Sequence, residues 1–232
     1  MVNKVKVSVL VAAHNEEEII LSFLESFLAM MKKIGEPWEM IIVENGSTDR
    51  TAEIIRNFSK KHTQIKLEQL PNPAYGKAMI TAFKKAKGDY AVFFNVDFWD
   101  ERFIRLCKID LLGYDLVGSS KLLKNSNDTR PFTRRLITQF YSLFLRLFLG
   151  FKGTDTHGIK AFRIKSVLPI VKKCKTTTGI FDSELVLRCQ RAGLSFLELP
   201  VEVREIRPTR FNFKRVLQTP ADIFKLFLAL KT

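Results

Sequence analysis

The sequence predicts an α/β fold in which a mostly parallel β-sheet is flanked by helices. Short, continuously apolar runs bounded by glycine or polar residues alternate along the chain with amphipathic stretches. The apolar runs have the composition of strands buried on both faces. Strands that alternate with helices are joined by right-handed crossovers and form a parallel sheet. The length of 232 residues suits one domain of this class.

The first hundred residues supply four predicted strands and three helices. The strands are expected at 5–13, 38–43, 65–70 and 90–94, and the helices at 16–33, 47–61 and 74–86. Three acidic residues, Glu16 to Glu18, suit the first turn of the first helix. Ser47 or Thr48 is expected to cap the second helix. The first strand is not followed by G-x-G-x-x-G, so the dinucleotide-binding fingerprint is missing.

The second half is predicted to continue with strands at 114–121 and 195–203 and helices within 130–151 and at 179–193. The end of the chain, 211–230, is apolar and basic, and Pro220 is expected to split it into two short amphipathic helices. Three cysteines form no C-x-x-C pair, which favours free thiols in a reducing compartment. No signal peptide and no bilayer-spanning stretch is found, so we expect a cytoplasmic protein with peripheral membrane contact.

The charge is unevenly distributed. The chain carries a net charge of +14, yet residues 1–100 hold 13 basic and 13 acidic residues, so the whole excess lies in residues 101–232. Nucleic acid, an anionic membrane surface and a phosphorylated substrate are the partners that such a patch suggests, besides a merely solvated surface. Because no nucleic-acid-binding motif is present, no nucleic-acid partner is expected.

Polar residues follow three of the predicted strands directly. They are His14 to Glu16, Glu44 with Asn45, and Asn95 to Asp97. In an open α/β sheet the carboxyl ends of neighbouring strands border one crevice, where ligands bind. A carboxylate placed there can hold a hard cation against a diphosphate. The alternative for the stretch 88–100 is an ordinary strand end followed by a turn.

Several segments together resemble one known family. They are VSVLVAAHNEEEII, IIVENGSTDRTAEII, GKAMITAFKKAKGDYAVFFNVD, DLVGSSK, DTHGIKAFR and FDSELVLRCQRAGLSFLELPVEV, in that order over roughly residues 5–215. The set resembles the family 2 glycosyltransferases of the GT-A fold, and within them the dolichyl-phosphate or polyprenyl-phosphate mannosyl- and glucosyltransferases. The resemblance implies inverting transfer of a hexose from a nucleoside diphosphate sugar, GDP-mannose or UDP-glucose, to a polyprenyl phosphate at a membrane surface.

The resemblance also implies where the donor binds. The first strand end is similar to the family's P-A-Y-N-E, and Asn95, Val96 and Asp97 match its D-x-D. Asn95 replaces an acidic ligand, so Mg²⁺ or Mn²⁺ would be held by Asp97 with the Asn95 carbonyl and the diphosphate itself. A metal-poor or degenerate site is the alternative. The residues implied to contact the nucleotide are Ala12, His14, Glu16, Glu44, Lys77, Asn95 and Val96.

The acceptor phosphate is expected to meet basic residues of the second half. Lys121 stands for the arginine of the family's G-S-R, and a lysine keeps the charge but loses the bidentate fork. The other cations proposed for this phosphate are Arg134, Arg135, Arg207 and Arg210. The stretch 130–151 is too apolar for an ordinary surface helix, so it is interpreted as an interfacial helix, with a core helix or a dimer interface as alternatives.

A phosphate acceptor is already an anion and needs no obligatory base, so Asp97, Lys121 and Arg135 are the expected catalytic residues. Asp155 and His157 lie in a segment that borders the sugar in the family, although a lone histidine is more commonly structural. We interpret His14 and His62 as structural in the same sense.

Asp182 and Glu184 either face the active site or, for Glu184, pair with Arg188 one helical turn later. The organisation expected is a GT-A domain over 1–215, with a nucleotide-binding half at 1–100 and an acceptor half at 101–215, and a helical tail at 216–232. A transferase with a soluble sugar acceptor, a noncatalytic nucleotide-sugar-binding protein and a nucleic-acid-binding protein are the competing functions.

Overall fold

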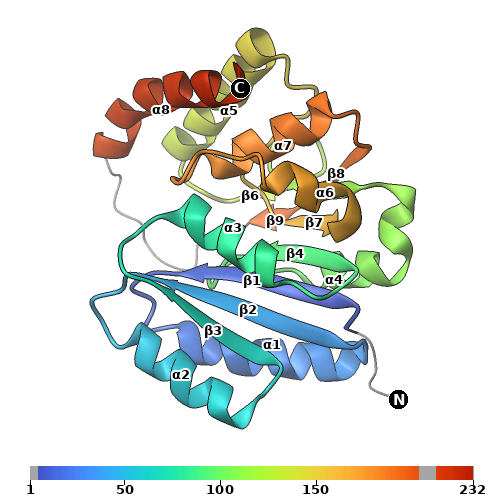
Figure 1. The fold of residues 1–232 in the computed structure, drawn as a ribbon. Helices are drawn as coiled ribbons and strands as arrows, with labels where there is room; N and C mark the ends of the chain where they lie inside the picture. The colour runs from blue at the N-terminus through green and yellow to red at the C-terminus, as the bar shows by residue number, and fades with distance from the viewer. Residues whose placement is uncertain (1–4, 204–212, 232) are drawn as a thin grey trace.

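The computed structural model describes residues 5–203 and 213–231. Within these residues seven strands form one sheet in the order β3-β2-β1-β4-β7-β5-β8, with helices on both faces (Figure 1). The strands are β1 (Val7–Ala13), β2 (Trp38–Asn45), β3 (Ile65–Leu70), β4 (Tyr90–Phe94), β5 (Leu116–Ser120), β7 (Lys160–Arg163) and β8 (Phe196–Pro200). Two short strands, β6 (Asn127–Asp128) and β9 (Glu202–Val203), pair separately. The predicted α/β class is confirmed.

The helices connect these strands and cover the sheet. They are α1 (Ile20–Ile34), α2 (Thr51–Lys61), α3 (Tyr75–Lys85), α4 (Glu101–Lys108), α5 (Phe132–Leu149), α6 (Ile164–Val171), α7 (Phe181–Arg191) and α8 (Phe213–Lys231), with a 3₁₀ turn at Asp110–Gly113. In Figure 1, α1 and α2 lie on one face of the sheet, and α3, α6 and α7 lie on the other.

Successive side chains of a strand point to opposite faces of the sheet, and in this protein they build a hydrophobic core on each face. Val9 and Val11 of β1 pack with α1 and α4, whereas Leu10 between them packs on the opposite side with α3 and α7. Both faces of β1 are therefore apolar, which is why its sequence is a continuous apolar run.

Strand β7 is the one antiparallel member of the sheet, since it runs against both of its neighbours, β4 and β5. Its first residue, Lys160, lies opposite Phe93 near the carboxyl end of β4. The start of β7 is therefore at the same edge as the carboxyl ends of β1, β2 and β4. This strand was not predicted.

Three local predictions were wrong. Helix α1 begins at Ile20 and has no acidic residue in its first turn, and the Glu17 carboxylate accepts from the backbone N–H of Arg50 instead. Asp49, and neither Ser47 nor Thr48, accepts from the backbone N–H of Thr51 at the start of α2. Helix α8 runs through position 220 as one element. A proline removes a single intrahelical hydrogen bond, and that loss does not end this helix.

Helices α5 and α8 lie together at one end of the molecule (Figure 1). Leu145 and Leu149 of α5 share an apolar cluster with Leu226 and Leu230 of α8. The outer faces of both helices remain apolar and exposed, through Phe140, Leu143, Leu147, Phe148, Phe224, Phe227 and Leu228. Among the described residues, no helix combines the length and apolarity needed to cross a bilayer.

Candidate active site

The loops after β1 and β2 are tied together at the expected donor crevice. The Nδ1–H of His14 donates to the carbonyl of Asn45 over 2.9 Å. Asn15 has a left-handed backbone (φ 54°), and its side-chain oxygen accepts from the backbone N–H of Thr48. The N–H of Glu16 donates to the hydroxyl of Thr51 over 2.8 Å. These bonds explain why two strand ends far apart in sequence present one polar surface.

Glu44 and Asn45 extend this surface towards α3. The Glu44 carboxylate accepts from the backbone N–H of Ser47 (2.5 Å) and from Gln69 (3.2 Å). The Asn45 side-chain oxygen accepts from the N–H of Ala74, directly before α3. Lys77, in the first turn of α3, is exposed. The residues predicted to bind the nucleotide on β1, β2 and α3 therefore lie together at the carboxyl edge of the sheet.

The stretch after β4 forms a tight turn. Asn95 and Phe98 exchange two backbone hydrogen bonds of 3.1 and 3.2 Å, which leaves Val96 buried and both Asn95 and Asp97 exposed. Asp100 caps α4 by accepting from the N–H of Arg102.

No group of three or more histidine, cysteine or acidic side chains suited to a metal is found in the described part of the chain. One exposed carboxylate, that of Asp97, close to one exposed carboxamide, that of Asn95, fits a divalent cation that takes its other ligands from a diphosphate and water.

A pocket of about 370 Å³ opens at the carboxyl end of β5, against α5. Its lining comprises Lys121, Leu122, Ser126, Asp128, Arg135, Gln139, Ser142, Leu143 and Arg146. The α5 residues in this set recur at helical spacing, so they form one face of the helix. This pocket is the candidate acceptor site.

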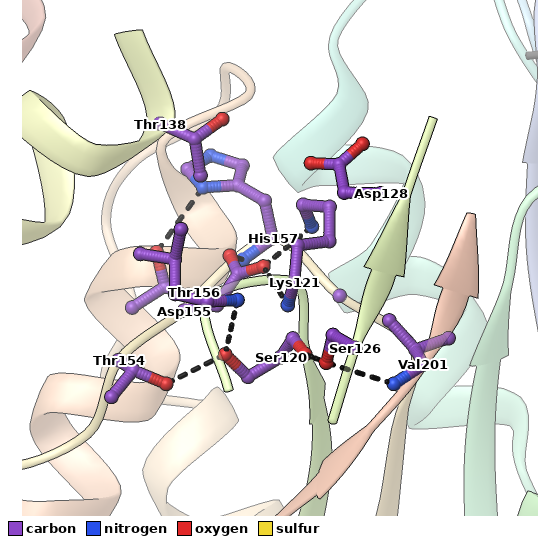
Figure 2. A network of polar contacts seen from close by, with 12 residues as sticks. Ser120, Lys121, Ser126, Asp128, Thr138, Thr154, Asp155, Thr156, His157 and Val201 are labelled. Atoms are coloured by element: carbon purple, nitrogen blue, oxygen red, sulfur yellow. Dashed lines mark hydrogen bonds and ion pairs between the residues drawn. The ribbon is translucent and has the colours of Figure 1, made fainter. Parts of the chain in front are cut away.

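Lys121 is less free than the sequence suggested. Its ammonium lies 2.5 Å from Asp155, and both side chains are nearly buried (Figure 2). Burial raises the pKa of Asp155, but attraction to Lys121 and its hydrogen bond outweigh that effect and bring the pKa down to about 2. Asp128 is held in the same way by Arg130, through bonds of 2.8 and 2.7 Å. The charges of Lys121 and Asp128 are therefore already compensated.

Two arginines of α5 supply the net positive charge of the pocket. Arg135 and Arg146 both line it, and Arg135 also lies over the ring of Phe132. Arg134 is outside the lining, and Arg207 and Arg210 fall outside the described residues. Arg146 was missed, although its spacing of eleven residues from Arg135, three helical turns, was visible in the sequence.

A second buried ion pair lies at the start of β7. Lys160 of β7 lies 3.4 Å from Asp182 of α7, and the hydroxyl of Tyr75 at the start of α3 donates to Asp182 over 3.1 Å. Asp182 therefore links the start of α7 to β7 and to the start of α3. Glu184 points inward instead and accepts from Arg188 (2.8 Å) and Thr176, so the structural alternative is confirmed for it.

The fold and these two adjoining sites define the class of protein. A mostly parallel sheet carries polar residues at its carboxyl edge, where folds of this kind bind ligands, and a basic pocket opens at the end of β5. That arrangement is expected of a group-transfer enzyme. The sequence model described as Glycosyl transferase family 2 matches residues 8–167. The chain belongs to this family, and it is a glycosyltransferase.

Two curated relatives give the range of similarity. The chain is 30% identical over 230 residues to the undecaprenyl-phosphate 4-deoxy-4-formamido-L-arabinose transferase of Pectobacterium atrosepticum, covering 96% of this chain and 68% of that protein. It is 28% identical over 244 residues to the dolichyl-phosphate beta-glucosyltransferase of Drosophila melanogaster, covering 96% and 74%.

Solved structures agree on the GT-A fold. Glucosyl-3-phosphoglycerate synthase from Mycobacterium tuberculosis, in complex with Mn²⁺, UDP-glucose and phosphoglyceric acid, superimposes with a TM-score of 0.68 at 19% identity, covering 97% of this chain and 79% of that one. A mannosyltransferase from Pyrobaculum calidifontis, in complex with GDP-mannose and Mn²⁺, gives 0.60 at 20% identity, covering 89% and 59%.

Proposed function

We propose that this glycosyltransferase moves a hexose, mannose or glucose, from a nucleoside diphosphate sugar to a polyprenyl phosphate, with inversion, at a membrane surface. The observation that carries the proposal is the pocket beside α5. It holds two arginines, and its lining carboxylate, Asp128, is engaged by Arg130 instead of by either of them. Leu143 in the lining belongs to the exposed apolar face of the same helix. An amphiphile with a phosphate head and a hydrocarbon chain matches both parts.

The two curated relatives described above are named for transfer to lipid phosphates, and this supports the acceptor class. The excess of positive charge in residues 101–232 serves this pocket and an anionic membrane without requiring nucleic acid. The exposed apolar residues of α5 and α8 would enter the headgroup region, which gives peripheral attachment at the cytoplasmic side of a membrane.

The reaction needs alignment and charge neutralisation. An oxygen of the acceptor phosphate attacks the anomeric carbon from the face opposite the leaving group, and the bond from that carbon to the diphosphate breaks with its electron pair. Arg135 orients and neutralises the attacking phosphate, and Lys121, whose charge is balanced by Asp155, lies beside it in the pocket lining. The loops after β1 and β2, with Lys77, hold the nucleotide.

A divalent ion belongs to the donor side of this proposal. Asp97 with the Asn95 carbonyl would hold Mg²⁺ or Mn²⁺, which would stabilise negative charge on the departing diphosphate. Because only one of these two ligands is charged, we expect weaker metal binding than at a site with two carboxylates.

The test uses purified full-length chain, a short polyprenyl phosphate in vesicles and a panel of labelled nucleotide sugars. Label should pass into organic-extractable lipid from one donor, and a chelator should reduce the transfer. Transfer only to a soluble sugar, or nucleotide binding without turnover, would replace the proposal by one of the two competing functions.

A further inference from the structure

His157 occupies an unusual position for a structural histidine. The residue is solvent-exposed, although it lies in the short loop before β7 between two buried ion pairs. The following residue, Gly158, lies so close to β5 that an added Cβ would be 2.0 Å from the carbonyl oxygen of Ser119. That close approach holds His157 beside the end of β5, where Lys121 begins the pocket.

The loop of His157 also shares a wall with the pocket. The hydroxyl of Ser142, a pocket residue on α5, donates to the carbonyl of Thr154 over 2.5 Å. The Asp155 carboxylate accepts from the backbone N–H of His157 (2.9 Å) and binds Lys121 through its other oxygen (Figure 2). Asp155 therefore fixes the histidine backbone and the lysine ammonium relative to each other.

A chain of three hydroxyls ends on one nitrogen of this ring. Tyr141 of α5 bonds to Ser183 of α7 over 2.8 Å, Ser183 bonds to Thr156 over 2.7 Å, and Thr156 bonds to Nδ1 of His157 over 3.2 Å. The Tyr141 ring also meets the imidazole edge-on, with centroids 5.3 Å apart. Each hydroxyl can donate or accept, so the chain serves Nδ1 whether the imidazole is neutral or protonated.

The other nitrogen, Nε2, has no hydrogen-bond partner among the described residues. An imidazole held through one nitrogen and free at the other is the usual arrangement when histidine exchanges a proton or binds a ligand. The expectation that His157 is purely structural does not account for its exposure or for this one-sided anchoring.

We propose that His157 is a catalytic residue whose Nε2 contacts the acceptor phosphate and takes its remaining proton before attack. This inference rests on the proposed function. In the step, the P–OH proton of a monoanionic phosphomonoester moves to Nε2, giving a dianion beside an imidazolium. The dianion attacks the anomeric carbon, the nucleoside diphosphate leaves with the bonding electrons, and the imidazolium later returns its proton to water.

The surrounding charges suit that task. Loss of hydration beside the buried groups that surround the imidazole lowers the pKa of His157. Asp182 and Asp155 raise this pKa, Lys160 and Lys121 lower it, and the net result is below the ordinary value. The ring is therefore neutral and ready to accept at neutral pH. Tyr141 is the titratable group that α5 presents to the ring, and burial raises the pKa of its phenol to about 12, so it stays protonated.

The expected signature is a pH-dependent effect of His157→Gln. A phosphomonoester has its second pKa at about 6, so nearly all of it is a dianion at pH 8 and only about one-tenth at pH 5. The variant should be within about threefold of wild type in kcat/KM for the acceptor at pH 8. The ratio of the kcat/KM of the variant to that of wild type should fall at least about fivefold between pH 8 and pH 5, because the variant can use only the dianion of the acceptor.

The matched control is His62→Gln, which changes a histidine whose ring packs at a tilt against Phe58, outside both sites. Its pH profile should follow wild type. Tyr141→Phe keeps the ring contact, removes the end of the hydroxyl chain, and should show a smaller version of the His157→Gln profile. A ratio of His157→Gln to wild type that stays constant from pH 5 to pH 8 would overturn the inference while leaving the proposed function intact.

A second measurement needs no turnover. In full-length protein labelled with ¹⁵N-histidine, a short polyprenyl phosphate alone should shift the imidazole signal that is missing in His157→Gln. A signal that moves only with the nucleotide sugar, or with neither ligand, also overturns the inference. Absence of transfer from every donor would instead refute the proposed function.

Discussion

Replacing Asp155 by asparagine should destabilise the fold by an amount that the structure lets us estimate. Asp155 and Lys121 form a nearly buried ion pair with a separation of 2.5 Å. The pKa of Asp155 falls from an ordinary 3.8 to about 2, and at about 1.4 kcal/mol per pKa unit this corresponds to about 2 kcal/mol. Leaving the Lys121 ammonium buried without its partner adds a further cost. Lys121 borders the open pocket, so water can reach the unpaired ammonium and reduce this further cost. We therefore expect a total loss of unfolding free energy of about 2 to 3 kcal/mol.

The assay is urea unfolding of the full chain at pH 7, with Glu53→Gln as control. Glu53 makes an exposed pair with Arg50, and its loss should change the unfolding free energy by less than about 0.5 kcal/mol. The double variant Asp155→Asn with Lys121→Met should recover part of the loss, because neither charge then remains buried. A loss below about 0.5 kcal/mol in Asp155→Asn alone would refute the view of a strong buried pair.

The same pair predicts a pH window. The folded pKa of Asp155 lies below its unfolded value, so its contribution to stability is complete above about pH 4 and is lost as the pH falls through about 2. The difference in unfolding free energy between wild type and Asp155→Asn should therefore shrink across this window. A difference that stays constant down to pH 2 would mean that the carboxylate charge is not what stabilises the site.

Three further variants test the remaining assignments. Asp97→Ala should abolish transfer while nucleotide binding without metal persists, and full activity would remove the metal role. Arg135→Ala should raise KM for the acceptor at least tenfold with little change in KM for the donor, since a charged hydrogen bond contributes about 1.5–3 kcal/mol; equal effects on both substrates would contradict its place in the acceptor pocket. Glu39→Gln should cost about 2 kcal/mol of unfolding free energy at pH 7, because the buried carboxylate accepts from Ser8 (2.8 Å), Lys66 and the N–H of Lys87. Burial raises the pKa of Glu39 and these bonds outweigh it, so the loss should diminish below about pH 4, and a pH-independent loss would contradict this account.

The strands that could be predicted are those whose own residues determine their burial. Strands β1, β2 and β4 are buried on both faces, so their apolar runs are unmistakable. Strand β7 has four residues with a cation at each end, and its neighbours in the sheet come from distant parts of the chain. Nothing in its own sequence marks it as a strand, because its pairing is decided by tertiary contacts.

The same distinction between local sequence and tertiary contacts applies to the residues of the site. Strand-end residues such as Asp97 follow from the rule that ligands meet the carboxyl edge of a parallel sheet. The pairing of Lys121 with Asp155, 34 positions away, depends on how the loop before β7 folds back, and composition cannot reveal it. Arg146 carried a visible helical spacing, but only the pocket shows that this face of α5 is concave.

Paired charges lie in the interior of the site and unpaired arginines lie at its surface. This distribution explains how the pocket binds a phosphate without breaking buried ion pairs. The floor pairs Lys121 with Asp155 and Lys160 with Asp182, so its buried charges balance. A dianion that had to separate such a pair would lose much of its own binding energy. Arg135 and Arg146 are exposed, line the pocket and form no ion pair with a carboxylate among the described residues, so they can attract the anion without breaking an existing buried pair. The balanced floor can then keep the loop of His157 in place while the exposed rim supplies the attraction.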